Sequence, residues 1–589
     1  MPKPVPMQSV RLHDHIGALA DRVIDRWLLT VRETNPAILS MLRAKNQRPS
    51  RYLLPWSGEF AGKHLTGCAY LYRLTRREEL LEESRAFLAE LLSCQEPNGY
   101  IGPFPEALQL TGRSPAPADC DLEREPFETW DAWGHYHIMT GLLCWYDITG
   151  DEALFAAVER IADLFLRSFY GDTGRRLVDI GSTEMNLAPY HVFAQLYNRT
   201  HRPEYLRFAG ELERDCADER AGNYLYYAKQ NLPFYQCPKP RWESLHIILG
   251  IAEMAEATGD RSYLDAAMQI FFSILATDVH NTGGFSTREQ AVGHPYGFDP
   301  IETCCVVAYD VLAAELYKKT GDRRLVEFLE WSLYNAVAGS FSKSGRWSTY
   351  NTPMDGHRRA NYDEIQFQSR PGSPDLNCCS VNAPRGLGLL ADWACVRLED
   401  GALLLNYYGA GEWVTLDGDR ITVGGNVLAD GVVRVDVACV DSGRRVRLRV
   451  PSWARSPRAA VNGRETALAG DELEVSGSAH IELALHPRVE FEQGKRDCAG
   501  KTSVRFGPVL LGVDADENPA FDLRRLPELD RRAVSAALPE PGRDGSLRLR
   551  VPTGKGTLVL TDFYTLGQTG ALYKTWLPVT GPDYSVCGL

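Results

Sequence analysis

Two cysteine-bearing segments, far apart in this 589-residue sequence, carry the side chains best suited to chemistry. The first reads Ile-Glu-Thr-Cys-Cys over residues 301–305, and the second reads Asn-Cys-Cys-Ser-Val-Asn over residues 377–382. Three thiolates and one harder carboxylate oxygen are a set that could close a tetrahedral zinc site. One of these thiolates could also be the nucleophile of an enzyme. The predicted ligands of a Zn²⁺ ion are Glu302, Cys304, Cys378 and Cys379.

Cysteines elsewhere in the chain have a simpler interpretation. Cys68, Cys144 and Cys439 are isolated, and buried cysteines usually behave as small hydrophobic residues. Two thiol pairs with a nearby carboxylate rarely assemble for packing alone, so we favour zinc for the four candidate ligands. A purely structural zinc without a catalytic cysteine remains open at this point.

Composition restricts the class of protein. With 44% hydrophobic and 24% charged residues, the sequence is typical of a globular protein of two to four domains. The formal net charge of −13 argues against a nucleic-acid or anionic-membrane partner. No run of about 18 apolar residues predicts a membrane span, and residues 1–16 lack the apolar core of an export signal. We therefore expect reduced cysteines and a cytoplasmic location.

A repeated turn motif indicates a helical region over residues 15–400. Thr-Gly-Asp occurs at residues 149–151, 258–260 and 320–322, where the glycine suits the end of one helix and the aspartate suits the start of the next. With weaker copies included, the motif recurs about every 50 to 75 residues, the length of a two-helix hairpin. About six hairpins predict an (α/α)6 toroid, with an open helical solenoid as the alternative.

The remainder of the chain has the pattern of strands. Short alternating segments separated by Gly, Asp and Pro turns predict an antiparallel β-sandwich over residues 401–589. The acidic, proline-rich segment 514–543 could divide this region into two sandwiches or split one. Residues 1–14 are expected to form an N-terminal strand that joins the sandwich. The predicted fold class is therefore multidomain α plus β, an (α/α)6 catalytic toroid followed by one or two sandwiches.

Six short motifs along the chain form a series. They are Thr282-Gly283-Gly284 with Glu289, Glu302-Thr303-Cys304, Leu333-Tyr334-Asn335-Ala336, Tyr350-Asn351-Thr352-Pro353, Cys378-Cys379-Ser380-Val381-Asn382 with Arg385, and Leu448-Arg449-Val450-Pro451-Ser452-Trp453-Ala454. In this order they resemble glycoside hydrolase family 127, the β-L-arabinofuranosidase-like group. Two positions depart from that pattern: Ser380 replaces the usual proline, and Cys305 is a second cysteine after the Glu302 motif.

The resemblance implies an exo-acting, retaining glycoside hydrolase that releases a terminal furanose-type sugar, such as a β-L-arabinofuranoside. It implies that Cys378 attacks the anomeric carbon and that Glu289 is the acid/base, with Zn²⁺ on the four ligands named above. Retaining hydrolysis needs its two groups about 5 Å apart, and a cysteine can replace the usual carboxylate nucleophile. The partner is then an oligosaccharide or glycoside, and the sandwich of such enzymes can mediate a homodimer.

Candidate sugar-binding residues come from predicted loops and helix starts that should lie on one face of the toroid. His135 and His246 resemble substrate-contacting histidines of the family, although a lone helical histidine is more often a core residue. Aromatic and acidic side chains could stack on a sugar ring or hydrogen-bond to it, although a single Trp is more often core. These candidates are Trp56, Glu59, Tyr100, Trp130 and Tyr350.

Two rival hypotheses stay open. The same toroid could work as a glycosidase or lyase with a carboxylate pair, Glu289 with Asp299 or Glu184, which would leave zinc structural. Alternatively, the chain could be a non-catalytic carbohydrate-binding scaffold. Nucleotide or redox-dithiol chemistry is not favoured, because the sequence has no Walker loop and no Cys-x-x-Cys.

Overall fold

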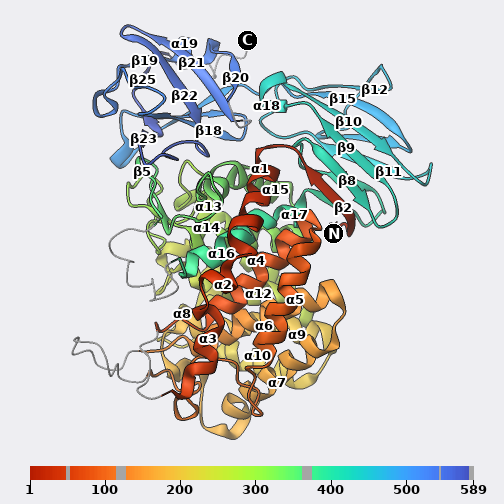
Figure 1. Cartoon of the computed structure of the whole chain (residues 1–589), viewed down its shortest axis with the longest axis vertical. Helices are drawn as coiled ribbons and strands as arrows, with labels where there is room; N and C mark the ends of the chain where they lie inside the picture. The colour runs from red at the N-terminus through yellow and green to blue at the C-terminus, as the bar shows by residue number, and fades with distance from the viewer. Residues whose placement is uncertain (48–53, 115–127, 361–374, 543–545, 583–589) are drawn as a thin grey trace.

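A closed ring of six helices forms the centre of the protein. The structure is a computed structural model that describes residues 1–47, 54–114, 128–360, 375–542 and 546–582. Each inner helix contacts the next, and the last contacts the first, which closes the ring (Figure 1). The predicted (α/α)6 toroid is therefore confirmed. The inner helices are α4 (Glu59–Thr75), α6 (Asp131–Thr149), α9 (Pro189–Thr200), α12 (Leu245–Thr258), α14 (Thr303–Thr320) and α16 (Cys378–Gly388).

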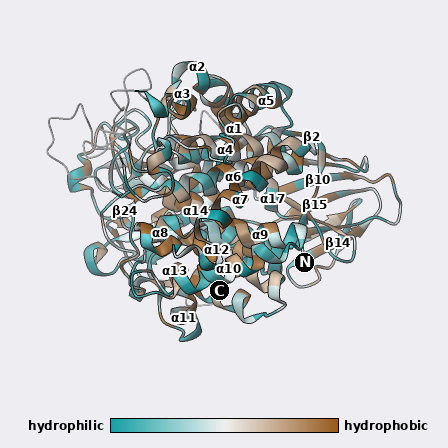
Figure 2. Cartoon of the chain, turned by 90° about the horizontal axis from the view of Figure 1, so that it is seen from below, coloured by the Kyte–Doolittle hydropathy of each residue, from teal (hydrophilic) through white to brown (hydrophobic). Residues whose placement is uncertain are grey.

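Outer helices cover this ring, each packed on the inner helix that precedes it in the chain. Outer helices bury one apolar face, as α7 does with Val158, Ile161 and Phe165, whereas α6 is buried on nearly all sides. Figure 2 shows α4, α6, α12 and α14 near the centre of the helical region, with α5 and α13 outside them. The outer helices are α5 (Glu78–Leu92), α7 (Glu152–Phe169), α10 (Pro203–Cys216), α13 (Ser262–Thr277) and α15 (Arg323–Ser332), while α1 (His15–Val23) packs on α16.

The Thr-Gly-Asp motif forms the predicted turns between inner and outer helices. Gly150, Gly259 and Gly321 have φ of 67°, 73° and 70°, the left-handed conformation that ends a helix at little cost only for glycine. Asp151 and Asp322 then accept hydrogen bonds from the backbone N–H groups two residues later and cap α7 and α15. This local chemistry reverses the chain after α6, α12 and α14, so each of these inner helices is followed by an outer helix.

Two sheets of mostly antiparallel strands form the first β unit, and the N-terminal residues contribute one strand to each sheet. β1 (Lys3–Pro4) pairs with β6 (Cys395–Arg397), and β2 (Met7–Leu12) pairs with β8 (Gly411–Thr415). Along β10 (Val432–Ala438), Val433, Val435 and Val437 are buried while the residues between them are exposed, as expected for a strand with one face on a core. The other strands are β7 (Leu403–Leu405), β9 (Arg420–Gly424), β11 (Arg445–Arg449), β12 (Arg458–Val461), β13 (Arg464–Thr466), β14 (Glu472–Ser476) and β15 (Ala479–Ala484).

A second β unit begins at β16 (Val489–Gln493) and forms a separate sheet. Its strands come from both sides of segment 514–543, which itself contains β19 (Leu529–Asp530), α19 (Arg531–Ala536) and β20 (Pro539–Pro541). The boundary between the two β units therefore lies near residue 486, and segment 514–543 belongs to the second unit. The remaining strands are β17 (Thr502–Phe506), β18 (Val509–Asp514), β21 (Leu547–Thr553), β22 (Gly556–Asp562), β23 (Leu572–Lys574), β24 (Trp576–Leu577) and β25 (Val579–Thr580).

The second β unit also meets the helical region directly. β23 pairs with β5 (Gly356–His357), which lies between α15 and α16 in the chain (Figure 1). None of the described helices is both long and apolar enough to cross a membrane.

Candidate active site and metal centre

The four predicted metal ligands lie together at the end of the ring where the inner helices begin, although up to 77 residues separate them in the chain. One donor atom from each lies within 4.8 Å of all the others. Cys379 Sγ is 3.5 Å from Cys304 Sγ and 3.8 Å from Cys378 Sγ, while Glu302 Oε1 is 3.3 Å from Cys379 Sγ and 3.7 Å from Cys378 Sγ. Tetrahedral bonds of about 2.3 Å place two sulfur ligands about 3.8 Å apart. The donor set therefore fits a zinc-sized ion.

Helix starts position these donors. Cys304 lies in the first turn of α14, and Cys378 and Cys379 begin α16. Glu302 is the residue before α14 and belongs to β3 (Ile301–Glu302), which pairs with β4 (Asn351–Thr352). The N-terminal ends of helices favour anions, so the fold gathers thiolates where the backbone stabilises them.

Exposure distinguishes one thiol from the others. Cys378 is 5% exposed, whereas Cys304 and Cys379 are 0% exposed and Glu302 is 1% exposed. Cys378 is therefore the least buried residue of the cluster.

Burial and the neighbouring side chains give the three thiols of the cluster unequal pKa values. Burial raises the pKa of Cys304, but hydrogen bonds from Cys378 and Cys379 and the positive charge of Lys63 outweigh it, so this pKa falls well below 9.0. Burial and the neighbouring Cys304 raise the pKa of the Cys378 and Cys379 thiols well above 9.0. A cation bound by all three sulfurs must therefore displace protons from the Cys378 and Cys379 thiols.

Lys63 supplies a buried positive charge beside the cluster. Its Nζ is 3.8 Å from Cys304 Sγ and 2.9 Å from a Glu59 oxygen, and the side chain is fully buried. Burial raises the pKa of Glu59 to about 7, and its carboxylate also accepts a hydrogen bond from the Trp133 indole. Three thiolates and a carboxylate carry more negative charge than one divalent cation neutralises, so Lys63 offsets part of the excess.

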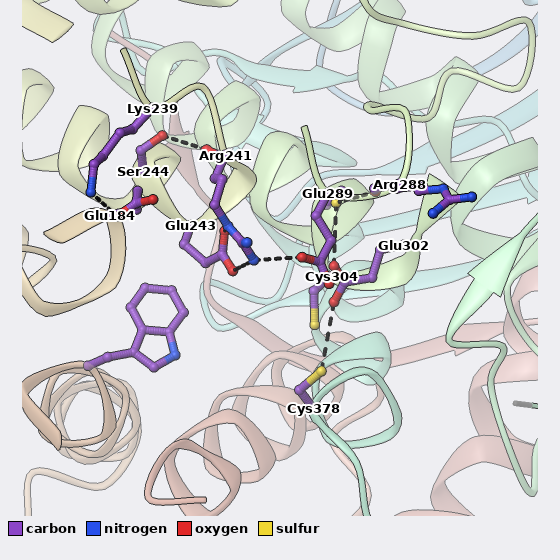
Figure 3. A network of polar contacts seen from close by, with 12 residues as sticks. Glu184, Lys239, Arg241, Glu243, Ser244, Arg288, Glu289, Glu302, Cys304 and Cys378 are labelled. Carbon is purple, nitrogen blue, oxygen red and sulfur yellow. Dashed lines mark hydrogen bonds and ion pairs between the residues drawn. The ribbon is translucent and has the colours of Figure 1, made fainter. Parts of the chain in front are cut away.

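A tight turn presents Glu289 toward the cluster. Thr287 and Gln290 exchange backbone hydrogen bonds, and Arg288 between them adopts the left-handed φ of 56°. The Glu289 side chain is 35% exposed, and its charge lies close enough to Glu302 to raise the pKa of the Glu302 carboxyl, in addition to burial. Figure 3 shows Glu289 beside Glu302 and Cys304, with Cys378 below them in this view.

Arg241 links Glu289 to a second carboxylate. One guanidinium nitrogen, Nη2, lies 2.6 Å from Glu289 Oε2 and 2.7 Å from Glu243 Oε1 (Figure 3). Glu243 is 1% exposed, and burial raises its pKa although Arg241 opposes the rise. Arg241 therefore fixes the position of Glu289 relative to the helical ring.

His246 belongs to a group of aromatic side chains on the axis of the ring. Its Nδ1 lies 2.8 Å from the Tyr136 hydroxyl, and its ring packs edge-on against Trp133. His137 packs edge-on against the same Trp133, and both of its ring nitrogens lack a hydrogen-bond partner among the described residues. His137 lies two residues after the predicted His135, on the same helix α6.

Protein groups occupy both ring nitrogens of His135. Nε2 accepts a hydrogen bond from the Ile101 backbone N–H, and Nδ1 lies 2.8 Å from the Asp131 carbonyl oxygen. Tyr100 is fully buried, donates to the Asp131 carboxylate and accepts from the Phe104 N–H. Each polar atom of these two side chains therefore has a partner within the protein.

The remaining sugar-binding candidates lie nearer the surface or the cluster. The rings of Trp56 and Trp130 lie 5.1 Å apart, and both are partly exposed. Tyr350 is 6% exposed, and the charges of Cys378 and Glu302 contribute to its raised pKa after burial, which places it beside the cluster.

Sequence reasoning missed three charged residues of this site. Lys63 is one helical turn after the predicted Glu59, a spacing that pairs opposite charges on a helix. Arg241 and Glu243 flank Trp242 just before His246. Their charges were visible in the sequence, but their common target, the cluster, became evident only in the folded chain.

The profile of the β-L-arabinofuranosidase GH127 (glycoside hydrolase family 127) catalytic domain matches residues 11–390, which include every residue of the cluster. The chain belongs to this family. It is therefore a glycoside hydrolase of the β-L-arabinofuranosidase group, as its motifs predicted.

Solved structures of GH127 proteins share the fold over nearly the whole chain. A GH127 β-arabinofuranosidase is 17% identical with a TM-score of 0.75, and the match covers 98% of both chains. A GH127 β-L-arabinofuranosidase from Geobacillus stearothermophilus T6 is 17% identical with a TM-score of 0.74, covering 97% of this chain and 100% of the other. No curated protein matches the chain. These structural similarities extend the shared fold to the β units.

Ser380, which departs from the family pattern, completes a cap on α16. Its hydroxyl oxygen accepts from the Asn377 N–H at 3.1 Å, while the Asn377 side chain accepts from the Ser380 N–H at 2.9 Å. The hydroxyl also lies 2.7 Å from the Asp375 carbonyl oxygen. Proline has no N–H to donate to Asn377, so this GH127 chain fixes the helix start by a reciprocal hydrogen-bonded cap instead.

Replacing Ser380 by alanine is expected to destabilise the protein by about 1 kcal/mol, because the Asn377 N–H loses its acceptor. Urea denaturation of Ser380→Ala measures this change in the free energy of unfolding. Ser442→Ala removes an exposed hydroxyl from the first β unit and should change stability by no more than about 0.5 kcal/mol. Equal stability of the two variants would contradict the capping role.

Cys305, the second departure, lies outside the ligand set but touches it. Its Sγ is 3.8 Å from Glu302 Oε2 and 3.4 Å from the Arg288 carbonyl oxygen. Burial raises the pKa of its thiol well above 9.0. Cys305 therefore contacts Glu302 as a neutral thiol, on the oxygen that the other cysteines do not approach.

Proposed function

We propose that this GH127 member is an exo-acting, retaining glycoside hydrolase that releases a terminal β-L-arabinofuranose or a related furanose. One observation carries the proposal: Cys378, at 5% exposed, is the least buried thiol of a buried Glu-Cys₃ cluster, and Glu289 lies next to that cluster. Family membership supports a glycoside substrate. The proposed cofactor is Zn²⁺, held by Glu302, Cys304, Cys378 and Cys379.

The chain's own residues divide the reaction between them. Cys378 attacks the anomeric carbon and forms a thioglycosidic bond while Glu289 donates a proton to the departing oxygen. Glu289 then removes a proton from water, which attacks the same carbon and returns the sulfur as thiolate. When bound, the metal keeps the sulfur ligands ionised and fixed in place. Lys63 offsets part of the negative charge of the ligands, and Arg241 fixes the position of Glu289.

The rival carboxylate-pair mechanism has less support. Glu184 forms an ion pair with Lys239 at 3.1 Å, on the far side of Arg241 from Glu289 (Figure 3). Asp299 is half exposed and pairs with Arg288. Glu289 also pairs with a cation, Arg241, but its charge acts on the metal ligand Glu302, whereas neither Glu184 nor Asp299 is among the main charges that act on Glu302.

A panel of aryl glycosides tests the proposed activity. The aryl β-L-arabinofuranoside is expected to be hydrolysed at least about tenfold faster than aryl pyranosides, with the β-anomer of arabinose formed first in the NMR spectrum. Initial formation of the α-anomer would refute retention. Absence of turnover on every furanoside, with zinc bound, would favour the non-catalytic scaffold.

Zinc content and its pH dependence test the metal centre. We expect one zinc ion per chain by elemental analysis. Because the pKa values of Cys378 and Cys379 are raised, protons compete with the metal as the pH falls. The apparent affinity should decrease by up to about tenfold per pH unit for each proton displaced. Competition with a chromophoric chelator near pH 6 and near pH 8 measures this trend, and equal affinities at both would contradict it.

A further inference from the structure

A large cavity lies at the opposite end of the ring from the metal centre. Its volume is about 610 Å³, and the later turns of α4, α6, α14 and α16 line it together with α9, β2 and Trp413 of β8. None of the four metal ligands lines it, and neither does Glu289. We call it the distal cavity. It lies at the junction of the toroid and the first β unit and forms no part of the proposed catalytic machinery.

The lining of the distal cavity is positively charged, although the whole chain has a net charge of −13. Its acidic side chains are all paired: Asp392 with Arg73 and Lys318, Asp147 with Arg199, and Glu315 with Lys318. Two further cations of the lining remain, Arg76 and Arg385. They form no ion pair with a described carboxylate, so the cavity carries an excess of positive charge.

Arg385 is the cation that most needs a partner. It is 4% exposed, its Nε has no hydrogen-bond partner among the described residues, and its guanidinium lies 5.4 Å from the centre of the Tyr70 ring. Burial of a charge without a counterion is costly, and a ring face compensates only part of that cost. A guanidinium that lines a cavity in this state is suited to a carboxylate or phosphate oxygen.

A neutral hydrogen-bonding group lies in the same lining. His191 lines the cavity, and burial lowers its pKa to about 3, so its ring is uncharged. Its Nδ1 and that of His246 both bond the Tyr136 hydroxyl, at 2.9 and 2.8 Å. A hydroxyl donates only one hydrogen bond, so one imidazole accepts from Tyr136 and the other donates to it. Two hydrogen bonds through Tyr136 therefore connect His191, in the lining of the distal cavity, to His246.

We propose that the distal cavity binds a small organic oxyanion, a carboxylate or a phosphate ester, with its charged group on Arg385. The volume exceeds that of a simple ion, and Leu74, Leu143 and Trp413 supply apolar wall for the body of such a molecule. This site is separate from the glycoside site and does not depend on the proposed reaction.

Calorimetric titration of the zinc-loaded full chain with orthophosphate and with citrate, at constant ionic strength, tests the site. At least one anion is expected to bind saturably at one per chain, and the stronger of the two identifies the class. Arg385→Gln should weaken that binding at least about tenfold, and Arg76→Gln at the same cavity about threefold. Arg214→Gln removes a charge that is 70% exposed elsewhere on the surface and should leave the affinity unchanged.

Three results would overturn the proposal. One is the absence of saturable binding of either anion up to about 50 mM, since a site with an unpaired buried guanidinium should be occupied at that concentration. Another is an affinity that is unchanged in Arg76→Gln, the variant that keeps the proposal testable if Arg385→Gln does not fold. The third is loss of binding in Arg241→Gln with retention in Arg385→Gln, which would place the anion at the metal centre.

Discussion

Replacing Cys378 by serine is expected to lower kcat on an aryl β-L-arabinofuranoside by at least about 10³-fold. A serine hydroxyl stays protonated where a metal-bound thiol is ionised, so the variant loses its nucleophile. The loss should appear in kcat more than in KM, because the sugar-binding residues remain. Turnover and thermal denaturation of Cys378→Ser, measured together, separate loss of the nucleophile from loss of the fold.

The matched control is Cys439→Ser, which removes a partly exposed thiol in the first β unit and should keep activity within about twofold. Since Cys378 is also a metal ligand, a second measurement is needed. Intact-protein mass after rapid quench should show one pentose residue attached to the wild-type chain, and peptide mapping should place it on Cys378. Attachment to a glutamate, or retention of most activity in Cys378→Ser, would refute the thiolate mechanism.

Replacing Glu289 by glutamine is expected to lower kcat about 10²- to 10⁴-fold on substrates with poorly acidic leaving groups. The effect should shrink for aryl groups that depart without a proton, because only protonation of the leaving oxygen is lost. In the second half of the reaction, added azide should replace the water that Glu289 no longer activates and should yield a glycosyl azide. Rates across a series of aryl leaving groups measure the first effect, and product analysis measures the second.

Glu184→Gln is the control that separates the two mechanisms. Glu184 pairs with Lys239, and its loss should change kcat by no more than about threefold if it takes no part in the chemistry. A loss as large as that of Glu289→Gln would support the carboxylate pair instead. A leaving-group dependence unchanged in Glu289→Gln would remove Glu289 from the acid/base role.

Helix ends explain why so much chemistry gathers at one end of the ring. Glu302, Cys304 and Cys378 all lie at the N-terminal starts of the inner helices α14 and α16, which contact each other in the ring. Like-charged donors repel one another wherever they are brought together. Here the helix N-termini and the buried positive charge of Lys63 offset the repulsion between the clustered thiolates and carboxylate.

The sequence by itself determined the local structure and the donor types of this protein. Glycine at residue 150 and aspartate at residue 151 specify a helix end and a helix start whatever surrounds them, since backbone conformation and capping act over a few residues. The alternating valines of β10 specify a strand with one buried face for the same reason. The motif series likewise identified the GH127 family, because it needs only residue types and their order.

Only the tertiary structure decided which charges meet. Lys63 lies 241 residues from Cys304 and Arg241 lies 48 residues from Glu289, and no periodicity links them. Closure of six helices into a ring brings such residues within a few ångströms, and burial there changes their pKa values. The same closure left Arg385 without a carboxylate in the distal cavity and occupied both nitrogens of His135. Side-chain partners depend on distances through space, which residue spacing along the chain does not fix.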